Sequence, residues 1–95
     1  MTRALQQRLR AAGLDPGQVP GPGLGPWEVW LRLHDRLGRR ATLVDLYELE
    51  AAGRGIRPEE LPAADRDRLK QASRQVRRGW VEVLPGSGRS GTRTR

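Results

Sequence analysis

Apolar residues recur every three or four positions in four segments of the chain, and this spacing predicts helices. The first segment, residues 2–12, places Leu5, Leu9 and Ala12 on one face. A face this small needs a partner surface, because a short isolated helix is only marginally stable in water. The sequence therefore predicts a short N-terminal helix that ends at Gly13, a residue suited to the left-handed conformation after a helix.

A proline- and glycine-rich segment, DPGQVPGPGLGP, follows this helix. Its prolines lack a backbone donor and its glycines add backbone entropy, so neither a helix nor a central strand is expected. We interpret residues 14–25 as a linker. Residues 1–13 then form a separate N-terminal helical arm.

Two further helices are predicted after the linker, each with signals at its ends. Pro26 suits a first helical turn, and Gly38 ends the apolar spacing that follows it. Thr42 is a suitable N-cap, and Asp45 three positions later completes a pattern similar to a capping box. Gly53 and Gly55 lie where the next helix is expected to stop.

The last predicted helix spans residues 63–78, with Gly79 as its C-terminal cap. The sequence WVEVL at residues 80–84 is rich in aromatic and β-branched side chains and predicts a strand. Residues 85–88, PGSG, have the composition of a turn.

These elements predict a mainly α fold with a three-helix core and a short C-terminal strand or hairpin, in addition to the separate arm. The compact helical domain covers residues 26–84, and residues 85–95 form a basic flexible tail. We expect the core to consist of Trp27, Trp30, Leu31, Leu46, Tyr47, Leu69, Val76, Trp80 and Val83.

Composition narrows the classes of protein that fit. The 95 residues contain no cysteine, which excludes disulfides and thiolate metal ligands and fits a reducing cytoplasm. No run of about 20 apolar residues exists, so we expect no membrane-spanning helix. The N-terminus lacks the apolar stretch of a secretory signal. The sequence therefore favours a small cytoplasmic protein.

The formal net charge of +7 lies almost entirely in the last third of the chain. Residues 1–64 hold nine arginines and eight carboxylates, whereas residues 65–95 hold nine basic side chains and three carboxylates. Such asymmetry favours a polyanionic partner. The alternative is that coding bias toward arginine gives a solvated surface that has no partner.

No group of residues predicts catalysis, a metal site or a cofactor. The single histidine, His34, shares the apolar face of Trp30, which favours a packed side chain over a metal ligand or a general base. The neighbouring carboxylates of residues 48–50 and 59–60 are expected to lie in water. We therefore expect a protein that is not an enzyme.

The basic C-terminal region is the one functional signal in the sequence. Four basic side chains at spacings of four, four and three are expected to line one face of the last helix, where they can meet several phosphates: Arg66, Lys70, Arg74 and Arg77. Arg78 and the tail arginines extend this cationic surface. The candidate nucleic-acid-binding residues are Arg66, Lys70, Arg74, Arg77, Arg78, Arg89, Arg93 and Arg95.

Three helices followed by a strand and a glycine turn with arginines resemble the winged helix-turn-helix class of DNA-binding domains. The segment RRGWVEVLPGSGRSGTRTR, residues 77–95, is similar to the end of a recognition helix and a wing. The resemblance implies that Arg66, Lys70 and Arg74 face duplex DNA and that Arg89 lies in the wing. The chain departs from the class in its long, proline-containing turn before the last helix.

A second resemblance covers residues 42–69, TLVDLYELEAAGRGIRPEELPAADRDRL, together with GWVEVLPGSGR. This stretch is similar to an N-terminal extension found ahead of GrpB-like nucleotidyltransferase-fold domains. The nucleotidyltransferase domain itself is absent from the chain, so the resemblance implies an accessory or interaction module and no catalytic residue.

Two functions remain open from the sequence. The first is a nucleic-acid-binding module, with duplex DNA as the expected partner. The second is a protein-interaction module, in which residues 2–12 or an exposed tryptophan dock on another protein, or residues 2–12 form a homodimer. An exposed apolar patch of several hundred Å² would favour the second function.

Overall fold

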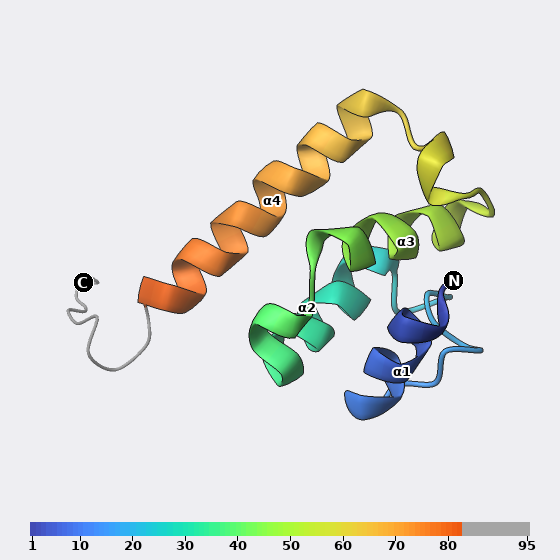
Figure 1. Ribbon diagram of the computed structural model, residues 1–95, viewed down its shortest axis with the longest axis horizontal. Helices are drawn as coiled ribbons and strands as arrows, with labels where there is room; N and C mark the ends of the chain where they lie inside the picture. The colour runs from blue at the N-terminus through green and yellow to red at the C-terminus, as the bar shows by residue number, and fades with distance from the viewer. Residues whose placement is uncertain (83–95) are drawn as a thin grey trace.

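The computed structural model describes the backbone of residues 1–82 and the side chains of residues 1–78. This part of the chain contains no strand, and its one isolated β-bridge joins Gly21 and Leu24. The elements are α1 (Arg3–Ala11), α2 (Pro26–Leu37), η1 (Gly38–Arg40), α3 (Leu43–Arg54), η2 (Pro58–Glu60) and α4 (Ala63–Glu82), where η marks a short 3-10 helix (Figure 1).

The signals predicted at the helix ends are confirmed. Pro26 opens α2, and Gly38 follows its last residue with a positive φ of 61°. At the start of α3 the Asp45 backbone N–H donates to Thr42 Oγ1 at 3.2 Å, and the Thr42 backbone N–H donates to Asp45 Oδ2 at 3.1 Å. This capping box satisfies two donors that the first helical turn leaves free. Gly55 ends α3 in the left-handed conformation, whereas Gly53, also predicted to stop this helix, lies within it.

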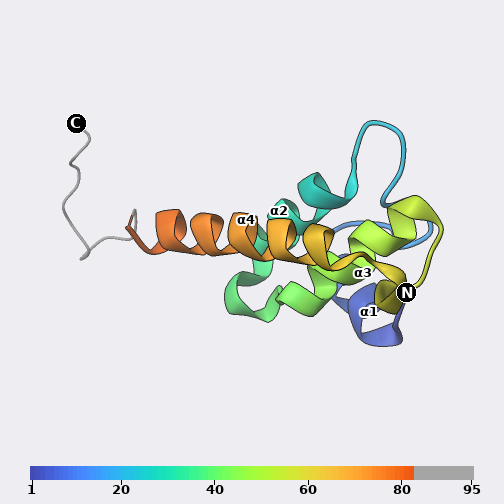
Figure 2. The ribbon, with the colours of Figure 1, turned by 90° about the horizontal axis from the view of Figure 1, so that it is seen from above.

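The core lies where α1, α2 and α3 meet, and α4 covers one side of it (Figures 1 and 2). Of the predicted core side chains, Trp30, Leu46 and Leu69 are buried. Four others are partly buried and pack against that core: Trp27, Leu31, Tyr47 and Val76. The side chains of Trp80 and Val83 lie outside the described residues. The prediction omitted several fully buried residues: Leu5, Leu9, Val29, Leu33 and Leu49.

Helix α1 is part of the core, so the prediction of a separate N-terminal arm is wrong. Leu5 and Leu9 are fully buried, and Ala12 is 5% exposed. A helix of nine residues is marginal on its own, and burial of its leucines against α2 and α3 supplies the stability that it lacks.

The segment of residues 14–25 is irregular, as predicted, but it also packs against the core. Leu14, Val19 and Leu24 are partly buried against it, so the segment carries the chain across the surface of the helices. A free spacer would not make these contacts with the core.

The predicted strand at residues 80–84 is wrong for residues 80–82, because α4 continues to Glu82. Residues 83 and 84 lie outside the described part of the chain. Extending an existing helix adds one hydrogen bond for each residue fixed, whereas a strand needs a partner to pair with. Gly79, predicted to cap the helix, therefore lies inside it, although an internal glycine costs about 1 kcal/mol relative to alanine.

Candidate nucleic-acid interface

An exposed row of cations runs along α4. Lys70, Arg74 and Arg78 are spaced by four residues and are all exposed. Spacing by four advances about 6 Å along a helix and turns only about 40° around it, so the three side chains follow one side of the helix. No carboxylate lies in the sequence between Asp67 and Glu82. The row is therefore a strongly positive surface, which we call the α4 stripe.

Arg66 and Arg77, also predicted to bind nucleic acid, have partners within the protein. Arg66 Nη2 donates to the backbone carbonyl of Glu59 at 3.1 Å, which ties α4 to η2. Arg77 Nη2 donates to the backbone carbonyl of Ala41, and its guanidinium carbon lies 5.8 Å from the centre of the Trp30 ring. Both arginines hold α4 against the body, and both are half-buried.

The remaining predicted site residues, Arg89, Arg93 and Arg95, lie outside the described residues. Of the predicted site residues, the structure therefore places Lys70, Arg74 and Arg78 together on α4. The part played by the tail arginines stays a prediction from the sequence.

Trp30 is the centre of the packing beneath α4. Its ring lies 5.6 Å from that of Trp27 and 5.2 Å from that of His34. Its Nε1–H donates to the backbone carbonyl of Thr42 at 2.9 Å, so a fully buried indole has its donor satisfied. These contacts position α2, α4 and the turn before α3 relative to one another.

His34 is 4% exposed and packs on Trp30, as the sequence indicated. Burial lowers the pKa of His34, and the positive charge of Arg77 lowers it further. Within residues 1–78, no group of three carboxylate, histidine or cysteine side chains is placed to hold a metal ion.

Carboxylates gather at the opposite end of α4, where arginines neutralise them. Arg54 pairs with Glu50 at 2.8 Å and with Asp65 at 3.0 Å, and Arg68 pairs with Asp65 at 3.3 Å. The hydrogen bond from Arg54 lowers the pKa of Asp65. Since these acids are matched locally, the uncompensated positive charge of α4 lies between Lys70 and Arg78.

The candidate interface also includes residues that the sequence prediction did not select. Arg39 and Arg40 are exposed on η1, immediately before Ala41, whose carbonyl binds Arg77. The sequence carries only a weak signal for these two arginines, because the contact between Ala41 and Arg77, which joins their turn to α4, depends on the fold. Arg40 also borders a surface pocket with Ala4, Gln7 and Arg8 of α1.

None of the described helices combines the length and apolar character needed to cross a membrane. Comparisons with protein-family models, curated proteins and solved structures give no match to the chain.

Proposed function

We propose that this protein is a non-catalytic nucleic-acid-binding module that contacts phosphates through the α4 stripe and the basic tail. Duplex DNA is the proposed partner. The observation that carries the proposal is the exposed row of Lys70, Arg74 and Arg78 on a helix segment that contains no carboxylate.

The geometry of the stripe suits a phosphate backbone. Successive cations are separated by about 6 Å along α4, and each strand of duplex DNA presents a phosphate about every 3.4 Å along the duplex axis. Several phosphates therefore lie within reach of the three flexible side chains at once. Each contact releases condensed counterions, which gives affinity without a requirement for sequence.

The alternative function, docking of α1 on a protein partner or a second copy, draws no support from the position of this helix. The leucines of α1 that would form such an interface are Leu5 and Leu9, and both are fully buried inside the protein. The large apolar side chains exposed in the described part of the chain are Met1 and Val44.

Fluorescence anisotropy with a labelled 20-base-pair duplex tests the proposal. We expect the wild-type chain to bind with micromolar affinity or better at about 50 mM salt and to weaken steeply as salt rises. Replacing the tail cations in R89Q/R93Q/R95Q should weaken binding and reduce the dependence on salt. Absence of binding at about 50 mM salt would exclude the proposed function.

A further inference from the structure

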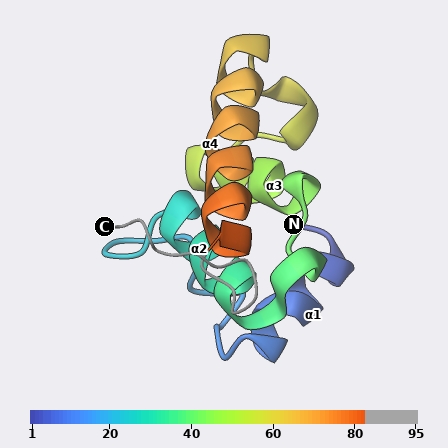
Figure 3. The same cartoon turned by 90° about the vertical axis from the view of Figure 1, so that its left-hand side faces the viewer.

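The turn that carries η1 is fixed against the second half of α4. Arg77 on α4 donates to the Ala41 carbonyl, one residue after η1, and Trp30 Nε1 donates to the next carbonyl, that of Thr42. Figures 2 and 3 show the chain just after α2 lying beside the C-terminal half of α4. Two consecutive carbonyls are thus held by α4 and α2, so η1 has a defined position.

The α4 stripe begins at the edge of the helix that adjoins this turn. At about 100° per residue, Lys70 lies about 20° from Arg77 around the helix, and Arg74 lies about 60° from it in the same direction. Arg78 lies about 100° from Arg77 in the same direction. The other edge of the buried face carries Asp65, Arg68 and Ala72 instead. The cations therefore occupy the side of α4 nearest to η1.

Arg39 and Arg40 add positive charge to the turn that Arg77 ties to α4. Both are exposed, and neither has an ion-pair partner within the described residues. The nearest acid after them in the sequence is Asp45, which is fully buried and paired with Arg8. No exposed carboxylate of this turn offsets the two arginines.

We propose that η1 is a second phosphate-binding element, in which Arg39 and Arg40 contact the DNA backbone beside the groove that receives α4. Arg77 is the positioning residue, because its bond to the Ala41 carbonyl fixes the place of η1 relative to α4. The inference rests on the proposed function and deepens it, because it adds two binding residues and requires a double-stranded partner.

Two elements that carry cations side by side fit a duplex better than a single strand. The major groove of B-form DNA is about 12 Å wide and admits an α-helix, and its borders are phosphate backbones. The deep, narrow major groove of A-form RNA does not admit one. A single strand would be expected to use exposed aromatic side chains for stacking, whereas within residues 1–78 Trp30 is fully buried and Trp27 and Tyr47 are partly buried. These differences favour duplex DNA.

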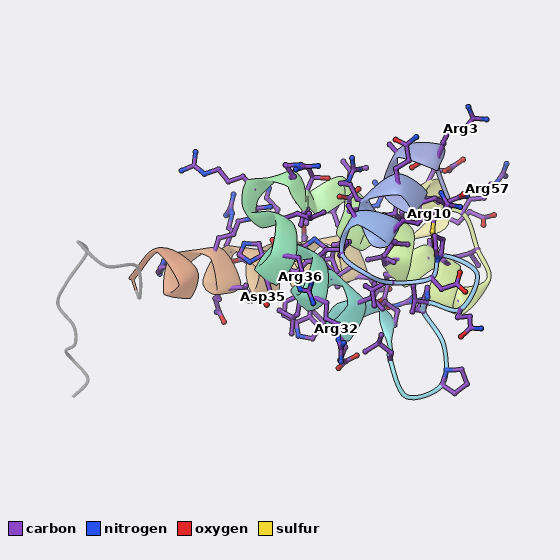
Figure 4. The ribbon with its side chains drawn as sticks, turned by 90° about the horizontal axis from the view of Figure 1, so that it is seen from below. Arg3, Arg10, Arg32, Asp35, Arg36 and Arg57 are labelled. Atoms are coloured by element: carbon purple, nitrogen blue, oxygen red, sulfur yellow. The ribbon has the colours of Figure 1, made fainter. Side chains whose placement is uncertain are left out.

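The test compares R39Q/R40Q with R32Q/R36Q, a control pair with the same change in charge. Arg32 and Arg36 are exposed on α2 and point away from α4; Figure 4 labels both on the face opposite to the one seen in Figure 2. Around α2, Arg32 lies about 160° and Arg36 about 120° from Trp30, whose ring faces Arg77. The probes are a 20-base-pair DNA duplex, the RNA duplex of the same sequence and one DNA strand.

For duplex DNA, the slope of log affinity against log salt should become shallower by about 1.8 in R39Q/R40Q, since two phosphate contacts are lost. The control should change it by less than about 0.5, because its charges lie on the far side of the protein. The RNA duplex and the single strand should bind more weakly than duplex DNA. Equal slopes for R39Q/R40Q and its control would overturn the inference and leave the proposed function standing.

The role of Arg77 has its own readout. In an R77K background, which keeps the charge but loses the geometry of the guanidinium contact, R39Q/R40Q should change the duplex slope by less than half as much as in the wild-type chain. Full additivity of the two changes would show that Arg77 does not position η1. If the wild-type chain binds no nucleic acid, the proposed function itself fails, which is a distinguishable result.

Discussion

Arg8 of α1 and Asp45 of α3 form a bidentate ion pair, with Nε–Oδ2 and Nη2–Oδ1 distances of 2.8 Å and 2.5 Å. The Asp45 carboxylate is fully buried, whereas the Arg8 side chain keeps 26% of its exposure. The hydrogen bond to Asp45 raises the pKa of Arg8. One turn along α3, Glu48, which we expected to lie in water, is 7% exposed and accepts the backbone N–H of Thr2 at 3.0 Å. Two carboxylates of α3 therefore hold α1.

Removing the Arg8 guanidinium should destabilise the protein strongly. In R8M the buried Asp45 carboxylate loses its charged partner, and we expect a loss of about 3 kcal/mol in the free energy of unfolding, measured in urea. The matched change R10M removes an exposed arginine from the same helix and should cost less than about 0.5 kcal/mol. Similar losses in both variants would contradict the structural role of the pair.

The packing of α1 gives a second prediction. L9A should lower the stability of the whole protein by about 2 to 5 kcal/mol, because it opens a cavity in a shared core. V44A, at a position that is 61% exposed, should change stability by less than about 0.5 kcal/mol. Amide exchange should show α1 and α3 opening together in the wild-type chain. Exchange of α1 at the rate of an unprotected peptide would argue for a separate arm instead.

Loss of the Arg77 contacts should weaken the attachment of α4. R77M removes a charged hydrogen bond to the Ala41 carbonyl and the contact with Trp30, and we expect a cost of about 2 kcal/mol in urea unfolding. R78M removes an exposed neighbour on the same helix and should be nearly neutral. The tryptophan emission of R77M should also shift relative to R78M. Equal stability of the two variants would show that Arg77 makes no net contribution to the fold.

His34 should make stability depend on pH in the mildly acidic range. Its pKa in the folded state is lowered below the ordinary value of 6.5, so the unfolded chain binds the proton more readily. The stability that the folded protein gains by keeping His34 neutral is fully present above about pH 6.5, and it is lost as pH falls through the lowered pKa. Urea unfolding of the wild-type chain should therefore show declining stability from pH 7.5 to pH 5, and H34Q should show a flatter profile. An equally steep decline in H34Q would assign the effect to another group.

The sequence predicted the helices well wherever the signals were local. Pro26, Gly38 and the pair of Thr42 and Asp45 mark helix ends through their own backbone chemistry, and each lies where it was expected. The docking of α1 was not predictable in this way, because the sequence indicates for Asp45 only a role in capping its own helix. Only the fold brings Arg8 within reach of its carboxylate.

The candidate site was predicted only in part, because local spacing can be read from the sequence and long-range contacts cannot. Helical spacing predicted that Arg66, Lys70, Arg74 and Arg77 line one face, but of these four only Lys70 and Arg74 are exposed. The same spacing cannot show that Arg77 bends back onto the Ala41 carbonyl, or that η1 therefore adjoins α4. The strand at residues 80–82 failed because β-propensity reflects packing against neighbouring strands, and α4 was already available to extend.

The salt dependence of duplex DNA binding tests the central claim most directly, with K70Q/R74Q/R78Q measured beside R10Q/R32Q/R36Q. The control triple carries the same change in charge on exposed arginines of α1 and α2, which Figure 4 labels. If the α4 stripe contacts phosphates, the slope of log affinity against log salt should become shallower by about 2.7 in the stripe variant and change little in the control. Equal slopes in the two triple variants would show that the stripe is only a solvated surface.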